Sequence, residues 1–121
     1  MLARRYDMVR QYDAKLPGEV IRPAHLRPDM TSDCHLYLAR LPGKTHASRS
    51  EIITRMAERG VACNVHYKPL PLLTAYKNLG FRMVDYPNAY AQFENEITLP
   101  LHTLLSDEDI DYVCACLKES L

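Results

Sequence analysis

Apolar side chains recur every three or four residues in several segments of the chain. In residues 1–17 this spacing predicts a helix that buries one stripe, formed by Leu2, Tyr6, Val9 and Tyr12. The dipeptide Pro17-Gly18 ends this helix. Residues 18–33 hold two prolines and little periodicity, so we expect a mobile connector there.

Two further helices carry capping signals at their first residues. Ser48 precedes Glu51 by three residues, a spacing at which each side chain can cap the other's free backbone N–H. That helix is predicted to run to Arg59, before Gly60. Ser106, followed by three acidic residues, predicts the start of the last helix. The expected buried stripes are Ile52, Ile53, Met56 and Ala57 in the first, and Ile110, Val113, Cys114 and Leu117 in the second.

Two short helices are expected between these. Residues 73–79 can form two helical turns that end at Gly80. Asp85 is the expected cap of the next helix, since Pro87 suits a first helical turn.

Short runs whose side chains alternate between two faces predict three strands, at residues 34–41, 61–66 and 97–99. In the first, the alternation places Cys34, Leu36 and Leu38 on one face and His35, Tyr37 and Ala39 on the other. In the second, Asn64 and His66 share the polar face. The order of elements predicts an α+β fold, a small sheet with helices packed mainly on one face. The pattern leaves open whether the strands are antiparallel or joined by a crossover.

Composition narrows the function classes. The chain has 121 residues, 47% of them hydrophobic, which suits one core. Its 15 basic residues balance 15 acidic ones, so we expect no nucleic-acid partner. The longest uncharged stretch, residues 97–106, is too short for a membrane span, and we expect no secretory signal in the first residues. We therefore expect a cytoplasmic protein whose four cysteines are reduced thiols.

Candidate chemistry centres on His66, at the end of a predicted strand and ahead of the stiff Pro69-Leu70-Pro71 segment. This side chain can project into a cleft, or it can simply close a strand end. His35 could line the same cleft or face solvent. The sequence has no HxH, HxxxH or CxxC pair, no nucleophile elbow and no glycine-rich phosphate loop. We expect no metal site and no complete catalytic apparatus.

Five stretches carry a resemblance to a known family. They are HLYLARL, RSEIITRMAERGVACNVHYKPLP, LLTAYKNLGF, YPNAYAQFENEITLPLH and LSDEDIDYVCACLKESL. In this order they resemble the closing portion of the DegT/DnrJ/StrS family of sugar-nucleotide aminotransferases. The resemblance implies the C-terminal small domain of a fold-type-I aminotransferase, with residues 1–17 as a linking helix from a large domain, 18–33 as connector and 34–121 as the small domain.

The resemblance also implies a function for the whole enzyme. It would transfer an amino group, expected to come from glutamate, to a nucleotide-linked keto-sugar, as a homodimer in polysaccharide biosynthesis. The lysine that forms the Schiff base with pyridoxal phosphate would lie in the large domain, so we expect this chain alone to be inactive and to bind no cofactor.

The resemblance also implies site residues, which are identified by the positions in this sequence that match those of the family. His66 matches a histidine near the amino-group acceptor, and Tyr67 is its companion. Lys68 could contact an anionic substrate group such as a diphosphate, or could be a solvated loop lysine. Pro71 stands where many relatives carry a second histidine, so no role that requires a histidine pair is expected. The predicted substrate-binding residues are thus His66, Tyr67, His35 and Lys68, with no catalytic, cofactor-binding or metal residues in the chain.

Two other functions remain open at this point. The chain could be a free-standing interaction or regulatory domain of the same fold. It could also be a small histidine-dependent hydrolase, although no partnered nucleophile is visible.

Overall fold

The computed structural model describes the whole chain, residues 1–121. Five helices and two strands are present: α1 (Leu2–Lys15), β1 (Tyr37–Arg40), α2 (His46–Glu58), α3 (Thr74–Asn78), α4 (Pro87–Phe93), β2 (Glu96–Leu99) and α5 (Asp107–Ser120). Single 3₁₀ turns occur at Leu70–Leu72 and Met83–Asp85. No helix combines the length and the apolar composition that a membrane span requires.

The sheet has two antiparallel strands, which decides the direction that the sequence pattern left open. The paired residues are Tyr37 with Leu99, Leu38 with Thr98, Ala39 with Ile97 and Arg40 with Glu96. Single bridges widen the sheet on both sides, from Ile21 to Arg40 and from Asn64 to Thr98. The strand predicted at residues 61–66 is therefore wrong: only Asn64 pairs with β2, and the rest of the segment is irregular.

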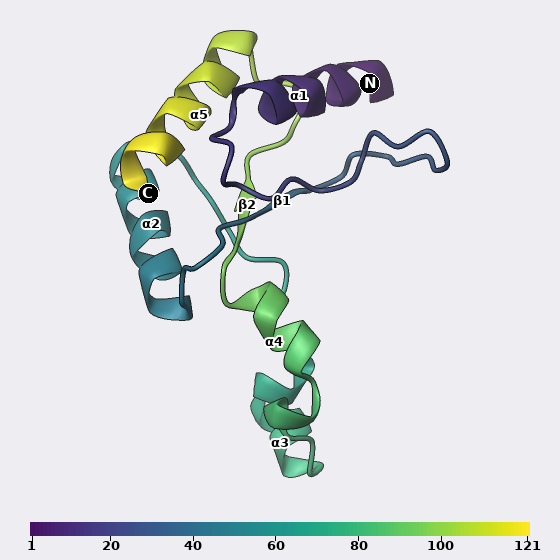
Figure 1. Cartoon of the computed structure of the whole chain (residues 1–121), viewed down its shortest axis with the longest axis vertical. Helices are drawn as coiled ribbons and strands as arrows, with labels where there is room; N and C mark the ends of the chain where they lie inside the picture. The colour runs from purple at the N-terminus through teal and green to yellow at the C-terminus, as the bar shows by residue number, and fades with distance from the viewer.

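The core lies on one face of the sheet, where β1 and β2 turn alternate side chains toward three helices. Tyr37, Ala39, Ile97 and Leu99 form one buried cluster with side chains of α1, α2 and α5. Helix α5 packs against both α1 and α2 (Figure 1). The predicted α+β layer, with helices on one face, is confirmed.

Helix α1 belongs to this core through Met8, Val9 and Tyr12, which are fully buried. The Tyr12 hydroxyl donates to the backbone oxygen of Pro100 at 2.7 Å, and its ring lies 4.8 Å from the Tyr37 ring. The predicted stripe is correct at its C-terminal half, whereas Leu2 is exposed.

The connector before β1 is tied to the rest of the molecule. The Arg22 guanidinium donates to backbone oxygens of Asp13, Val20 and Leu16. The His25 ring is half-buried and bonds Ser32 Oγ and the Leu36 carbonyl oxygen, each at 2.7 Å. These contacts give residues 18–33 a defined path across the sheet edge.

Residue Cys34 explains why the first predicted strand is wrong at its start. Its φ of 50° lies in the left-handed region, which breaks the alternation, and β1 begins only at Tyr37. Tyr37 and Ala39, predicted to share a face with His35, are buried in the core, while His35 is exposed ahead of the strand.

Helix caps follow local hydrogen bonds. Ser106 and Asp109 form a capping box on α5, which confirms the predicted start of this helix. In α2 the cap is Thr45, and Ser48 is its partner, so the predicted Ser48–Glu51 box is wrong by three residues. Asp85 does not cap α4 either: its carboxylate pairs with Arg82, at 2.9 Å.

Residues 69–93 form a helical lobe that extends away from the core (Figure 1). An apolar cavity of about 400 Å³ opens in it, lined by Pro69, Leu70, Pro71, Tyr76, Phe81, Tyr86 and Ala89. The stiff Pro69-Leu70-Pro71 segment therefore connects the sheet edge to the lobe.

The four cysteines are free thiols, as predicted. Burial raises the pKa of Cys63 to about 12 and that of Cys114 to about 11, from an ordinary 9.0. Above pH 9 the unfolded chain loses these protons while the folded chain keeps them. We therefore expect the free energy of unfolding, measured in urea, to fall as pH rises from 9 to 11. The Cys63→Ala, Cys114→Ala double variant should show a smaller fall, and an equal fall would contradict this origin.

Candidate functional site: a buried polar cluster beside His66

Strand β2 carries two polar side chains on the face opposite the core. Because side chains alternate along a strand, Ile97 and Leu99 enter the core while Glu96 and Thr98 face away from it. Glu96 and Thr98 are nevertheless buried, with 1% and 5% exposure. Polar groups this inaccessible require hydrogen-bond partners, and the segment that contains His66 supplies them.

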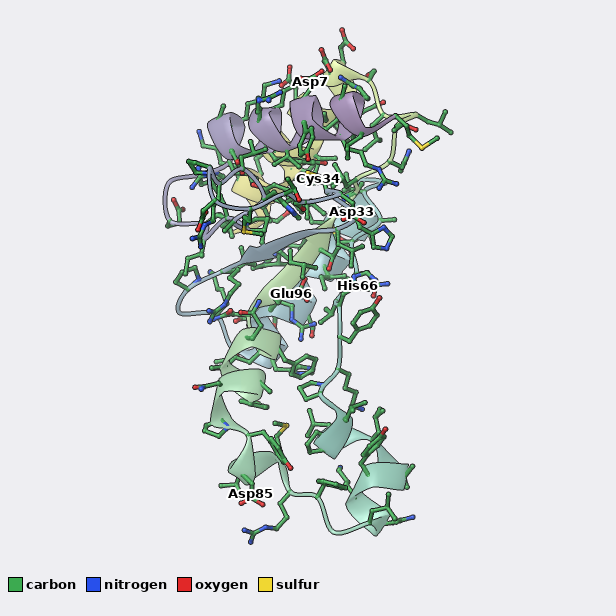
Figure 2. The ribbon with its side chains drawn as sticks, turned by 90° about the vertical axis from the view of Figure 1, so that its right-hand side faces the viewer. Asp7, Asp33, Cys34, His66, Asp85 and Glu96 are labelled. Atoms are coloured by element: carbon green, nitrogen blue, oxygen red, sulfur yellow. The ribbon has the colours of Figure 1, made fainter.

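His66 is held to β2 by two contacts. Its backbone N–H donates to Glu96 Oε2 at 3.0 Å, and its ring Nδ1 lies 2.8 Å from Thr98 Oγ1. The Thr98 hydroxyl in turn donates to Glu96 Oε1 at 2.6 Å. Glu96 thus receives a hydrogen bond on each carboxylate oxygen (Figure 2 shows Glu96 and His66 next to each other at the level of the sheet). These contacts hold the His66 side chain in one position, so this residue does more than close a strand end.

The backbone of the same segment is also bonded to β2, at Asn64, two residues before His66. Asn64 and Thr98 exchange two backbone hydrogen bonds, at 3.2 Å and 2.8 Å. His66 is therefore positioned through both its backbone and its ring.

The environment of Glu96 combines burial with nearby positive charge. Burial raises the pKa of the Glu96 carboxyl, and the hydrogen bonds from Thr98 and from the His66 backbone oppose this rise, as does the charge of Arg49. Burial is the larger effect, so the pKa of Glu96 remains raised, while the two hydrogen bonds to the carboxylate oxygens and the neighbouring cation favour the ionised form and limit this rise.

Arg49 closes the cluster from helix α2. Its side chain is buried, with 4% exposure, and donates to the Phe93 carbonyl oxygen at 3.2 Å. The guanidinium lies 5.1 Å from the centre of the Phe93 ring, a cation–π distance. Burial lowers the pKa of Arg49, and the charge of Glu96 opposes this. Helix α2, β2 and the end of α4 thus meet around the buried guanidinium of Arg49.

Tyr67 and Lys68 follow His66 directly and point to more open regions. The Tyr67 ring meets the His66 ring edge-on at 4.6 Å and is 73% exposed. Lys68 lines a cavity of about 280 Å³ together with His46, Leu72, Lys77, Tyr90 and Phe93. Two lysines, a histidine and aromatic rings around one hollow suit an anionic ligand with a flat group.

The structure does not bond His35 to this cluster. The backbone N–H of His35 donates to Asp33 Oδ1, and its exposed side chain makes no hydrogen bond with His66. Of the four predicted substrate-binding residues, His66 and Tyr67 are in edge-to-face contact, Lys68 lines the adjacent hollow, and His35 stands apart.

Glu96, Thr98 and Arg49 were missed by the sequence reasoning. The alternation in EITL does signal two polar side chains on one strand face. Their approach to His66 spans about thirty residues of sequence and depends on the Asn64 bridge, which no local pattern encodes.

The cluster offers no nucleophile for hydrolysis. Thr98 is the hydroxyl bonded to His66, but it is buried and its proton is directed to Glu96. No group of three metal-ligating side chains is present either. These findings give no support to the hydrolase alternative.

The lysines of the chain do not fit the amine that pyridoxal phosphate requires, which must be desolvated or otherwise activated. Lys15 pairs with Asp111, and Lys44 donates to the Leu121 carbonyl oxygen. Lys68 and Lys77 line the open hollow, and Lys118 is exposed on α5. None of the five lysines is therefore buried and activated as this cofactor requires.

Comparison with known proteins identifies the class to which this fold and site belong. A protein of Streptococcus pneumoniae, Spr1654, assigned as a sugar aminotransferase, matches in its apo form with a TM-score of 0.96 and 53% identity over 99% of this chain. The aminotransferase PseC of Helicobacter pylori, involved in the biosynthesis of pseudoaminic acid, matches with a TM-score of 0.86 and 25% identity over 98% of this chain. The structure is thus an aminotransferase fold.

The family follows from the sequence. Residues 1–118 match the model of the DegT/DnrJ/EryC1/StrS aminotransferase family, and the chain belongs to this family. The spore coat polysaccharide biosynthesis protein SpsC of Bacillus subtilis is 29% identical over 98% of this chain. The chain spans 32% of the length of SpsC, 30% of that of Spr1654 and 32% of that of PseC.

Proposed function

We propose that this chain forms the substrate-side wall of a pyridoxal-phosphate aminotransferase that aminates a nucleotide-linked keto-sugar. The observation that carries the proposal is the fixed position of His66, two residues before Lys68 and its cavity. The family membership and the sugar aminotransferase match support the reaction class. The cofactor class is supported by Spr1654, which has been solved in a PLP form and a PMP form.

The residues of the chain would bind and orient the substrate. His66 presents its ring toward the place that the amino donor and the amino-group acceptor occupy in turn, and the exposed Tyr67 beside it covers the sugar and excludes water. Lys68 and Lys77 attract the diphosphate, while Tyr90 offers a ring for the base. His35 approaches the substrate from the loop before β1.

The remaining machinery would lie outside the chain. A large domain would contribute the lysine that holds pyridoxal phosphate, with this chain as the C-terminal domain and α1 leading into it. We further propose glutamate as amino donor, a homodimer and a cytoplasmic location. This chain alone would then bind no cofactor and be inactive.

A chimera tests the proposal. The chain would replace the matching region of Spr1654, and the conversion of the PLP form to the PMP form by L-glutamate would be followed by absorbance. We expect the chimera to convert within about tenfold of the parent rate, because the two sequences are 53% identical over 99% of this chain.

The isolated chain is the control for this experiment. Mixed with pyridoxal phosphate and L-glutamate, it should show no stoichiometric attachment of cofactor to a specific lysine. A folded chimera without conversion, or an isolated chain that converts glutamate, would contradict the proposal.

A further inference from the structure

We infer that Glu96, acting through Thr98, fixes the neutral His66 ring as the Nδ1–H tautomer, so that Nε2 presents a hydrogen-bond acceptor. Glu96 and Thr98 are then positioning residues for His66. The identity of the group that Nε2 meets rests on the proposed function; the tautomer itself does not.

The argument starts from the number of protons available. A threonine hydroxyl has one proton, and the Thr98 hydroxyl directs it to Glu96 Oε1 at 2.6 Å. Thr98 Oγ1 can therefore only accept from the His66 ring. Since Nδ1 lies 2.8 Å from this oxygen, Nδ1 must carry the ring proton. The neutral ring then has a lone pair on Nε2.

The direction of this chain of hydrogen bonds depends on the carboxylate. Glu96 accepts the His66 backbone N–H on one oxygen and the Thr98 hydroxyl on the other, which an ionised carboxylate can do without supplying a proton. An amide at residue 96 has one oxygen that accepts and one NH₂ group that can only donate. Its oxygen would be taken by the His66 backbone N–H, and its NH₂ would face Thr98 Oγ1.

A reversal follows from this geometry. In Glu96→Gln, the Thr98 oxygen accepts from the amide, and its hydroxyl proton turns to His66 Nδ1. The ring proton is then displaced to Nε2, which becomes a donor. In the native chain, Glu96 thus keeps His66 Nε2 as an acceptor, which favours a ligand that offers a hydrogen-bond donor. Next to His66, a substrate hydroxyl or amine would be favoured over a carbonyl or phosphate oxygen.

Ring-nitrogen NMR tests the inference. In the ¹⁵N-labelled full chain, at a pH where the ring is neutral, the Nδ1 and Nε2 shifts of His66 report which nitrogen carries the proton. His66→Gln identifies the resonances, and the exposed ring of His35 is the internal control. We expect the Nδ1–H pattern in the native chain and in Thr98→Ser, and the Nε2–H pattern in Glu96→Gln.

Thr98→Val provides a second variant, should Glu96→Gln fail to fold. It removes the acceptor for Nδ1–H, and we expect the Nδ1–H pattern to be lost while the backbone amide spectrum outside the cluster is retained. An Nε2–H pattern in the native chain overturns the inference, as does a folded Glu96→Gln or Thr98→Val that keeps Nδ1–H. A failed chimera with a confirmed tautomer overturns only the proposed function.

Discussion

Replacement of Tyr12 by alanine is expected to lower the free energy of unfolding by about 3–5 kcal/mol, the loss typical of a large aromatic side chain removed from a core. The Tyr12 ring is fully buried between α1 and the sheet, next to Tyr37. Small domains are stable by only about 5–15 kcal/mol, so this variant should be close to unfolding. Urea titration followed by far-ultraviolet circular dichroism measures the change.

Matched variants separate the parts of this loss. Tyr12→Phe keeps the ring but removes the hydrogen bond to the Pro100 carbonyl oxygen, at a cost of about 1–3 kcal/mol. Tyr67→Ala deletes the same side chain from a site that is 73% exposed, and should change stability by roughly 0.5 kcal/mol or less. Equal stability of the Tyr12→Ala and Tyr67→Ala variants would show that α1 does not stabilise the fold.

The sequence predicted best those elements whose signals are local. The start of α5 rests on Ser106 and Asp109, three residues apart, and both bonds of the capping box form. Helix α2 shows the limit of such signals. Thr45 lies three residues before Ser48, as Ser48 does before Glu51, so the same spacing fits two starts.

The sheet was predicted less well because its pairing is not local. Residues 61–66 alternate like a strand, yet only Asn64 reaches β2. The left-handed backbone of Cys34 shifts the face on which the following side chains lie, so that Tyr37 enters the core. A cysteine in the left-handed backbone region is uncommon, and no neighbouring residue in the sequence indicates this conformation.

The candidate site shows the same division. His66 stood out because of its place at a segment end and because of its resemblance to a family residue. The carboxylate and hydroxyl that hold it are contributed by β2, and their role is visible only once Asn64 and Thr98 are paired. Sequence reasoning thus singled out the histidine and missed the carboxylate and the hydroxyl that hold it in place.

The second large effect concerns activity in the chimera with Spr1654. His66→Ala is expected to reduce kcat/KM for L-glutamate by about 10- to 100-fold, the equivalent of one or two directed hydrogen bonds near the reacting groups. The ring is half-buried and its Nε2 is free, so its removal takes away a fixed contact. Conversion of the PLP form, followed by absorbance at several donor concentrations, gives kcat/KM.

His102→Ala is the matched control, because this exposed histidine lies outside the polar cluster and should leave kcat/KM unchanged. Thermal unfolding of the chimeras separates a lost contact from a lost fold. If His66→Ala converts glutamate at the parent rate, His66 does not contact the donor substrate, and the orientation imposed by Thr98 and Glu96 would serve the keto-sugar alone. Equal losses in both variants would instead indicate a general effect on the domain.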